Sequence, residues 1–247
     1  MKRSTSFFRP MLLTFTLLLV VVLNTGCSNE ESSPLPPVST NEIQILPLGD
    51  SRVEGNRPDH ESYRYELWKL LISENLDIDF LGSQIDNAIY PRFNDTSFDV
   101  NHEGMVGDRT FEVLDRVNQL TSTNPSAVGN VVLLGVGGND LHQGVSPSAA
   151  ITNIITIIDA LQEANPDVTI LLERIAPGRS DFQASSGLTD AFNTFNSEIT
   201  IVAGTKTTAR SNVLAVDMSG ILTDSDYADE IHYNTSGAQK IAQQYFN

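Results

Sequence analysis

Apolar runs of strand length alternate with longer segments of helical period from Glu42 to the end of the chain. Five runs are expected to form strands: 43–48, 78–81, 130–135, 168–173 and 213–216. Five segments are expected to form helices: 63–74, 110–120, 148–164, 188–203 and 236–245. This alternation favours crossover units built around a parallel sheet.

The chain is expected to contain one folded domain, at residues 42–247. Its 247 residues are 40% hydrophobic, which suffices for one sizeable core, and no internal repeat is visible. The five strands and five helices predict an α/β fold, a three-layer α/β/α flavodoxin-like sandwich with a five-stranded parallel sheet. Residues 27–41 are rich in Ser, Pro and Glu and almost without apolar side chains, so we expect a disordered tether there.

Residues 1–26 have the order of an export signal. Basic residues precede an apolar stretch at 11–23, and two small residues then lead into Cys27. The apolar stretch is short for a bilayer-spanning helix, which needs about 20 residues. Cys27 is the only cysteine of the chain, so an intramolecular disulfide is excluded.

The sequence Leu-Asn-Thr-Gly-Cys at 23–27 resembles the lipobox of bacterial lipoproteins, whose cysteine becomes the lipidated first residue of the mature chain. Asn24 departs from the pattern, which usually has Leu there. The resemblance implies an exported protein of the bacterial cell envelope that contacts a membrane only through lipid on Cys27. Ordinary cleavage near Cys27, without lipidation, is the alternative.

The charge of the chain argues against one class of partner. Fifteen basic residues stand against 31 acidic ones, for a formal net charge of −16. A chain this acidic is poorly suited to bind nucleic acid through a broad basic patch. We therefore expect no nucleic-acid partner.

The first expected strand ends in a glycine turn with Ser51 just past it, in the sequence LPLGDSR at 46–52. Such a turn can present the hydroxyl above the sheet, where the next helix offers backbone N–H groups to a developing anion. Gly-Asp-Ser by itself is a common tripeptide, so an ordinary strand-to-loop turn is the alternative interpretation.

Three further motifs follow in order: Gly107 within HEGMVGD at 102–108, Asn139 within GVGGND at 135–140, and Asp229 and His232 within DEIH at 229–232. Together with the serine block they resemble the four conserved blocks of the SGNH (GDSL-like) hydrolases. The resemblance extends from Ile43 to Phe246. It implies a serine esterase that hydrolyses carboxylic esters through an acyl-enzyme.

The resemblance assigns the catalytic residues Ser51, His232 and Asp229. A serine hydroxyl is a weak nucleophile until a base takes its proton, and histidine titrates near neutrality. Asp229 would hold the imidazole in the required tautomer. The oxyanion hole would combine the backbone N–H groups of Ser51 and Gly107 with the side-chain amide of Asn139. A simple turn at Gly107 and a loop cap at Asn139 are the structural alternatives.

No metal and no cofactor are implied. The acidic run at 224–230 lacks the glycine and the terminal glutamate of a calcium loop, and no phosphate-binding Gly-Lys-Ser/Thr motif occurs. His60 and His142 lie in polar sequence and are expected to be exposed to solvent. His102 is expected to orient the loop of the glycine block.

Local sequence narrows the substrate. PLGDS at 47–51, Tyr63-Arg64, DFLGS at 79–83 and HEG at 102–104 resemble the branch that contains acetylxylan esterases. That resemblance implies removal of O-acetyl groups from a polysaccharide or from a small carbohydrate ester. Arg52 and Val106 depart from the pattern and leave the substrate open.

Two alternatives remain. The same fold hosts lysophospholipases, thioesterases and arylesterases, and a noncatalytic glycan-binding surface lipoprotein would belong to a different class. Tyr90, Phe93 and Phe98 precede the glycine block and would either form a platform for a sugar ring or pack beneath their loop.

Overall fold

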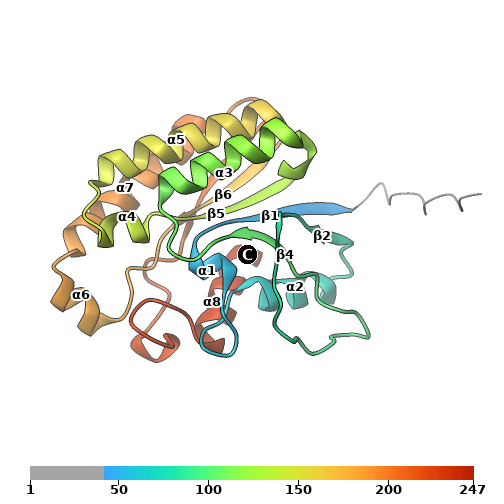
Figure 1. Cartoon of the computed structure of the whole chain (residues 1–247), viewed down its shortest axis with the longest axis horizontal. Coiled ribbons are helices and arrows are strands. Elements are labelled where there is room, and N and C mark those ends of the chain that lie inside the picture. The colour runs from blue at the N-terminus through green and yellow to red at the C-terminus, as the bar shows by residue number, and fades with distance from the viewer. Residues whose placement is uncertain (1–41) are drawn as a thin grey trace, which may run out of the picture. The chain divides into compact units, whose positions relative to one another are not determined.

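A computed structural model describes residues 42–247 (Figure 1), so the expected signal at 1–26 and tether at 27–41 lie outside the described residues. The strands are β1 (Ile43–Gly49), β2 (Ile78–Phe80), β3 (Gln84–Ile85), β4 (Asn101–Gly104), β5 (Val131–Gly135), β6 (Thr169–Arg174) and β7 (Val213–Asp217). The helices are α1 (Ser51–Glu54), α2 (Arg64–Ser73), α3 (Thr110–Thr123), α4 (Gly138–His142), α5 (Pro147–Ala164), α6 (Ser180–Ser186), α7 (Thr189–Lys206) and α8 (Thr235–Phe246), with 3-10 turns η1 (Pro125–Val128) and η2 (Asp224–Asp226).

The strands form one sheet in the order β3-β4-β1-β5-β6-β7, and β2 also pairs with β1. Every pairing is parallel except that of β3 with β4. The expected α/β fold with a parallel sheet is confirmed, and all five predicted strands are present. The sheet also contains β3 and β4, which the apolar pattern missed because β3 has two residues and β4 consists of Asn-His-Glu-Gly.

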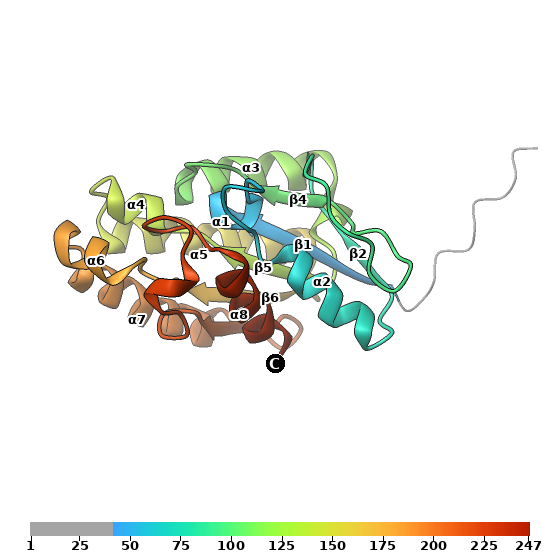
Figure 2. The same ribbon diagram turned by 90° about the horizontal axis from the view of Figure 1, so that it is seen from below.

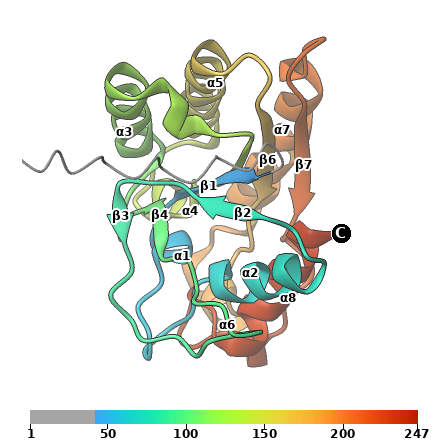
Figure 3. The same ribbon diagram turned by 90° about the vertical axis from the view of Figure 1, so that its right-hand side faces the viewer.

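Helices cover both faces of the sheet. Figures 2 and 3 show α3, α5 and α7 on one face and α2 and α8 on the other. Strand residues alternate between the two cores that result. In β5, Val132 and Leu134 pack in the core beneath α3, α5 and α7, while Leu133 packs in the core beneath α2 and α8.

The helices begin where local sequence satisfies their first N–H groups. Ser146 accepts from the Ala149 N–H at the start of α5, and Pro147 follows at the first helical position. Asn234 accepts from the N–H groups of Ser236 and Gly237 at the start of α8. No helix within residues 42–247 combines the length and the apolar character needed to cross a membrane.

Candidate active site

Ser51 is the first residue of α1, and Asp50 alone separates it from the end of the central strand β1. Asp50 caps this short helix, and its carboxylate accepts from the Arg52 N–H at 3.0 Å. Gly49 lies so close to β5 that a Cβ there would stand 2.0 Å from the Gly135 carbonyl oxygen. The tight packing of β1 against β5 therefore fixes the turn, which carries Ser51 at the carboxyl edge of the sheet, where ligands of such folds bind.

His232 approaches Ser51 from the loop between η2 and α8. Its Nε2 lies 2.8 Å from Ser51 Oγ, and its Nδ1 lies 2.7 Å from Asp229 Oδ2. Asp229 Oδ1 accepts from the N–H groups of Ile231 and His232. Partial burial favours a higher pKa for Asp229, but these hydrogen bonds outweigh it and lower the pKa to about 2. The carboxylate is therefore ionised and oriented toward the imidazole.

The neighbouring acids have other partners. Asp224 accepts from the N–H and hydroxyl of Ser180. Buried Asp226 accepts from Lys240 Nζ at 2.6 Å and from the Ser236 hydroxyl at 2.7 Å. Of these carboxylates, it is that of Asp229 that contacts the His232 ring.

Gly107 precedes Asp108, the residue through which this loop contacts Asn139 of α4. Gly107 has a φ of +80°, which favours glycine, and a Cβ there would meet no atom within 4 Å. The Asn139 amide nitrogen, near the start of α4, donates to the Asp108 carbonyl at 2.9 Å. That nitrogen carries two N–H groups, so its second remains for a ligand.

Two residues that support this loop pair were not predicted. Asp140 is 1% exposed, and its carboxylate accepts from the Thr110 N–H and hydroxyl at 2.8 and 2.7 Å, which joins α4 to the start of α3. Arg116 donates to the Gly49 and Glu103 carbonyls and lies 2.9 Å from the Asp108 carboxylate. The only sequence signal for Asp140 was its place after Asn139 in the GVGGND motif at 135–140. Arg116 had no such signal, because it lies in ordinary helical sequence.

The expected exposure of His60 is wrong. Its ring stacks on that of His232, with centroids 4.1 Å apart and an interplanar angle of 21°. The ring is half-buried, and its Nε2 is shielded without a hydrogen-bond partner among the described residues. Burial lowers the pKa of His60, and the neighbouring His232 lowers it further. His60 is therefore a neutral ring against one face of His232, which no local motif could have indicated.

The other two histidines are also packed. His142, expected to be exposed, is half-buried against the rings of Phe182 and Phe192. His102 is 3% exposed, and its Nδ1 accepts from the Gly104 N–H at 3.1 Å, in keeping with its expected contact with the glycine block.

Arg52 turns into the protein. Its guanidinium donates to the Ala176 carbonyl at 2.6 Å and stands 5.3 Å from the centre of the Tyr233 ring. Arg52 therefore ties α1 to the segment after β6. The departure from the family pattern at this position is accounted for by this internal contact.

Tyr90, Phe93 and Phe98 were expected either to form a platform for a sugar ring or to pack beneath their loop. Their contacts favour packing. Phe98 is 8% exposed, and its ring centroid lies 4.7 Å from that of Tyr90 and 5.6 Å from that of Trp68. Tyr90 donates its hydroxyl to Asp86. Phe93 meets Trp68 edge-on. These rings form a cluster beneath the loop.

Within residues 42–247 no three His, Cys, Asp or Glu side chains are grouped so that they could hold a metal ion. The site itself offers the side chains of Ser51, His232 and Asp229, with N–H donors nearby. A hydroxyl, an imidazole and an ionised carboxylate in this order form the arrangement used for acyl transfer.

Comparison with known proteins identifies the family of the chain. Residues 48–240 match the model of the GDSL-like Lipase/Acylhydrolase family. No curated protein sequence matches the chain significantly.

Three of the similar solved structures are described as carbohydrate or acetyl esterases. A carbohydrate esterase family 3 protein from Talaromyces cellulolyticus is 26% identical, with a TM-score of 0.69 over 82% of this chain and 94% of its own. A family 3 carbohydrate esterase from Clostridium thermocellum is 29% identical, with a TM-score of 0.66 over 83% and 94%. An acetyl esterase mutant with acetate ion is 26% identical, with a TM-score of 0.67 over 82% and 93%. The chain belongs to the GDSL-like lipase/acylhydrolase family and is a carboxylic ester hydrolase.

Proposed function

We propose that the protein removes O-acetyl groups from carbohydrate, with Ser51 as nucleophile and His232 and Asp229 completing the triad. The observation that carries the proposal is the continuous contact from Ser51 Oγ to His232 Nε2 at 2.8 Å and from His232 Nδ1 to Asp229 Oδ2 at 2.7 Å. Asp229 accepts a hydrogen bond from Nδ1–H, which keeps the ring proton on Nδ1 and leaves Nε2 unprotonated and able to act as a base.

In the first half of the reaction, His232 Nε2 takes the Ser51 proton while Oγ forms a bond to the acetyl carbonyl carbon. Negative charge on the carbonyl oxygen is stabilised by the N–H groups of Ser51 and Gly107 and by the Asn139 amide. His232 then gives its proton to the departing sugar oxygen, and acetyl-Ser51 forms. Water, deprotonated by His232, attacks the acetyl group, which releases acetate and restores Ser51.

His60 acts in this scheme as a positioning residue. Its neutral ring lies against His232 with centroids 4.1 Å apart and limits rotation of the catalytic imidazole. A neutral neighbour also permits His232 to carry the proton in the transition state, whereas a protonated His60 would repel it.

The acetyl preference is supported by the relatives. Three solved proteins that are 26–29% identical over more than four fifths of this chain are described as an acetyl esterase or as family 3 carbohydrate esterases. The test compares acetate release from acetylated xylan with hydrolysis of p-nitrophenyl acetate, butyrate and octanoate by the purified protein. We expect acetate release and a fall in kcat/KM as the acyl chain lengthens. Faster hydrolysis of octanoate than of acetate would instead favour a lysophospholipase, thioesterase or arylesterase. Absence of turnover on every ester would favour glycan binding without catalysis.

Export and lipid attachment at Cys27 belong to the same proposal. They rest on the apolar stretch at 11–23 and on the lipobox-like sequence that ends at Cys27, all of which lie outside the described residues. An envelope location would place the enzyme where it meets polysaccharide.

A further inference from the structure

The contact between Ser51 and His232 joins two parts of the chain that lie 181 positions apart. The residues that follow these two, Arg52 in α1 and Tyr233 in the loop before α8, also contact each other. The guanidinium carbon of Arg52 stands 5.3 Å from the centre of the Tyr233 ring, within the range of a cation–π interaction. The nucleophile and its base are therefore accompanied by a second contact between the same two segments.

Tyr233 is fixed by its surroundings. The residue is 1% exposed, and its carbonyl accepts from the Glu61 N–H at 2.8 Å. A Cβ on Gly237 would stand 3.2 Å from Tyr233 Cβ, so the first turn of α8 packs closely against it. The Tyr233 hydroxyl has no hydrogen-bond partner among residues 42–247. What Tyr233 offers to Arg52 is therefore its ring and not its hydroxyl.

The second contact of Arg52 is also to a fixed group. Its Nη1 donates to the Ala176 carbonyl at 2.6 Å, and Ala176 is fully buried. The preceding residue, Ile175, exchanges two hydrogen bonds with the side-chain amide of Asn196 in α7, at 2.8 and 2.9 Å. Because Arg52 follows Ser51 directly, its contacts with the carbonyl and with the ring restrict where α1 places the nucleophile.

Charge also favours the inward position of Arg52. Two carboxylates near it are buried: Asp50 is 6% exposed and Glu173 is 5% exposed. Burial raises the pKa of Asp50, and the positive charge of Arg52 lowers it. Burial likewise raises the pKa of Glu173 to about 7, against the hydrogen bond from Tyr245 and the charge of Arg52. Arg52 therefore compensates negative charge near the nucleophile, which draws its guanidinium away from solvent.

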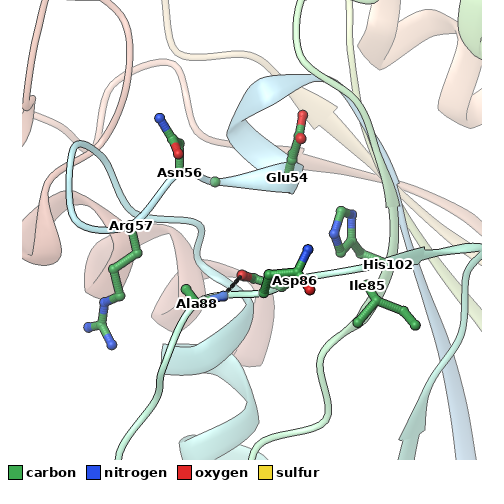
Figure 4. A pocket seen from close by; sticks show the side chains of 9 residues that line it. Glu54, Asn56, Arg57, Ile85, Asp86, Ala88 and His102 are labelled. Atoms are coloured by element: carbon green, nitrogen blue, oxygen red, sulfur yellow. Dashed lines mark hydrogen bonds between the residues drawn. The ribbon is translucent and has the colours of Figure 1, made fainter.

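The opposite end of α1 is held by a different arginine. Buried Arg64 donates to the carbonyls of Val53 and Glu54, at 2.8 Å in each case. Beyond Glu54 lies a polar cavity of about 310 Å³, and Figure 4 shows Glu54 at its wall. The contacts of Arg64 join α1 to α2 and leave the distance to the loop of His232 undetermined. Arg52 supplies a contact in that direction.

We propose that Arg52 is a positioning residue that clamps the nucleophile to its base. It holds α1 against the Tyr233 ring and the Ala176 carbonyl. Ser51 Oγ thereby stays within hydrogen-bond distance of His232 Nε2. Arg52 acts through Ser51 and does not touch the substrate. The inference rests on the proposed triad and adds to it a residue that supports its geometry. Because a misplacement of about 1 Å can cost about 100-fold in rate, such a support affects kcat.

Four substitutions and one control test the clamp. Arg52→Leu removes the guanidinium, and Arg52→Lys keeps the positive charge near the buried carboxylates. Tyr233→Leu removes the ring, whereas Tyr233→Phe keeps the ring and removes only the hydroxyl. Arg210→Leu is the matched control, because Arg210 pairs with Asp167 at the surface, in the loop that enters β7 at the amino edge of the sheet.

The measured quantities are kcat and KM for p-nitrophenyl acetate and the rate at which a fluorophosphonate labels Ser51, each per mole of folded protein. Arg52→Leu and Tyr233→Leu should lower kcat and the labelling rate about 10- to 100-fold, with KM changed less than about twofold. Arg52→Lys should recover part of the loss. Tyr233→Phe and Arg210→Leu should keep the wild-type values. Because Arg52 and Tyr233 form one contact, the double variant Arg52→Leu/Tyr233→Leu should lose little more than Arg52→Leu alone.

Wild-type kcat in Arg52→Leu would overturn the inference. If Arg52→Leu does not fold, equal kcat in Tyr233→Leu and Tyr233→Phe would overturn it. A rise in KM at unchanged kcat would mean that Arg52 contacts the substrate, and losses that multiply in the double variant would mean that Arg52 and Tyr233 act separately. Either result would exclude the clamp.

The outcomes also separate the clamp from the proposed function, because these assays use no carbohydrate. Failure of the wild-type protein to release acetate from every carbohydrate would overturn the proposed substrate and leave the clamp standing. Labelling of Ser51→Ala by the fluorophosphonate would overturn the proposed nucleophile instead.

Discussion

Asparagine in place of Asp229 tests the proposed triad at the one atom where an acid and an amide differ. Oδ1 of Asp229 accepts from the N–H groups of Ile231 and His232, and Oδ2 lies 2.7 Å from His232 Nδ1. Asparagine keeps a carbonyl oxygen for the two backbone N–H groups, so the turn at 229–232 should persist. Its amide nitrogen would take the place of Oδ2 and offer an N–H to Nδ1.

A donor that faces Nδ1 requires this nitrogen to be unprotonated, which moves the ring proton to Nε2. Nε2–H would then face Ser51 Oγ across 2.8 Å and could not accept the hydroxyl proton. In the serine-protease triad the same exchange lowers kcat by about 10,000-fold. The Asp229 side chain is 53% exposed, so water can partly replace it as the acceptor for Nδ1–H. We therefore expect a loss in kcat of about 1,000- to 10,000-fold.

The assay is the steady-state hydrolysis of p-nitrophenyl acetate, with thermal unfolding measured in parallel. Glu230→Gln is the matched control, since it changes the adjacent carboxyl in the same way, and it should keep the wild-type kcat. A loss below about tenfold in Asp229→Asn would refute the reasoning and reduce the catalytic unit to Ser51 and His232. A larger loss in Glu230→Gln than in Asp229→Asn would show that the wrong carboxylate had been assigned.

Ser51→Ala should abolish turnover and labelling by a fluorophosphonate while the protein stays folded; retained turnover would exclude Ser51 as nucleophile. Asn139→Ala should lower kcat by about 100-fold or more with little change in KM, whereas a change in KM alone would assign Asn139 to substrate binding. His60→Ala should lower kcat by about tenfold at unchanged KM, and His60→Phe should keep most of the wild-type kcat. Equal kcat in the wild-type protein and both variants would show that the stacking of His60 on His232 has no role in the mechanism. Hydrogen bonds, among them one from Lys240, hold the pKa of Asp226 below its usual range, so its contribution to the free energy of unfolding is present above about pH 4 and is lost as the pH falls. When chemical unfolding is compared at neutral and acid pH, Asp226→Asn should lose less free energy of unfolding in acid than the wild-type protein. Equal losses in the two proteins would contradict this. Mass spectrometry of the mature envelope protein should find lipid on Cys27, and an unmodified N-terminus beyond Cys27 would show simple cleavage.

The spacing of apolar residues was enough to predict the longer helices and strands, because each of them depends on residues that are close in sequence. The helix expected at 110–120 is α3, and the strand expected at 168–173 is β6, with ends shifted by a few residues. Elements without an apolar pattern escaped prediction. Helix α1 has four residues, and its cap Asp50 acts within the turn after β1. Strand β4 exists because its backbone pairs with β1 and β3.

The sequence by itself determined the residue types of the candidate site and their order, because ordered blocks around Ser51, Gly107, Asn139 and His232 suffice for the resemblance. It also determined the parallel sheet, whose carboxyl edge gathers the loops that follow its strands. The chemistry of a serine esterase was therefore predictable before any coordinate was known.

Only the tertiary structure decided which groups touch across long separations. His60 and His232 stack although 172 positions separate them, and no period or motif encodes that contact. Arg52 could be assigned to an internal contact only once Ala176 was seen beside it. The pairing of Asp140 with Thr110 is likewise a property of packing, because hydrogen-bond satisfaction depends on every atom that surrounds a group and not on its neighbours in sequence.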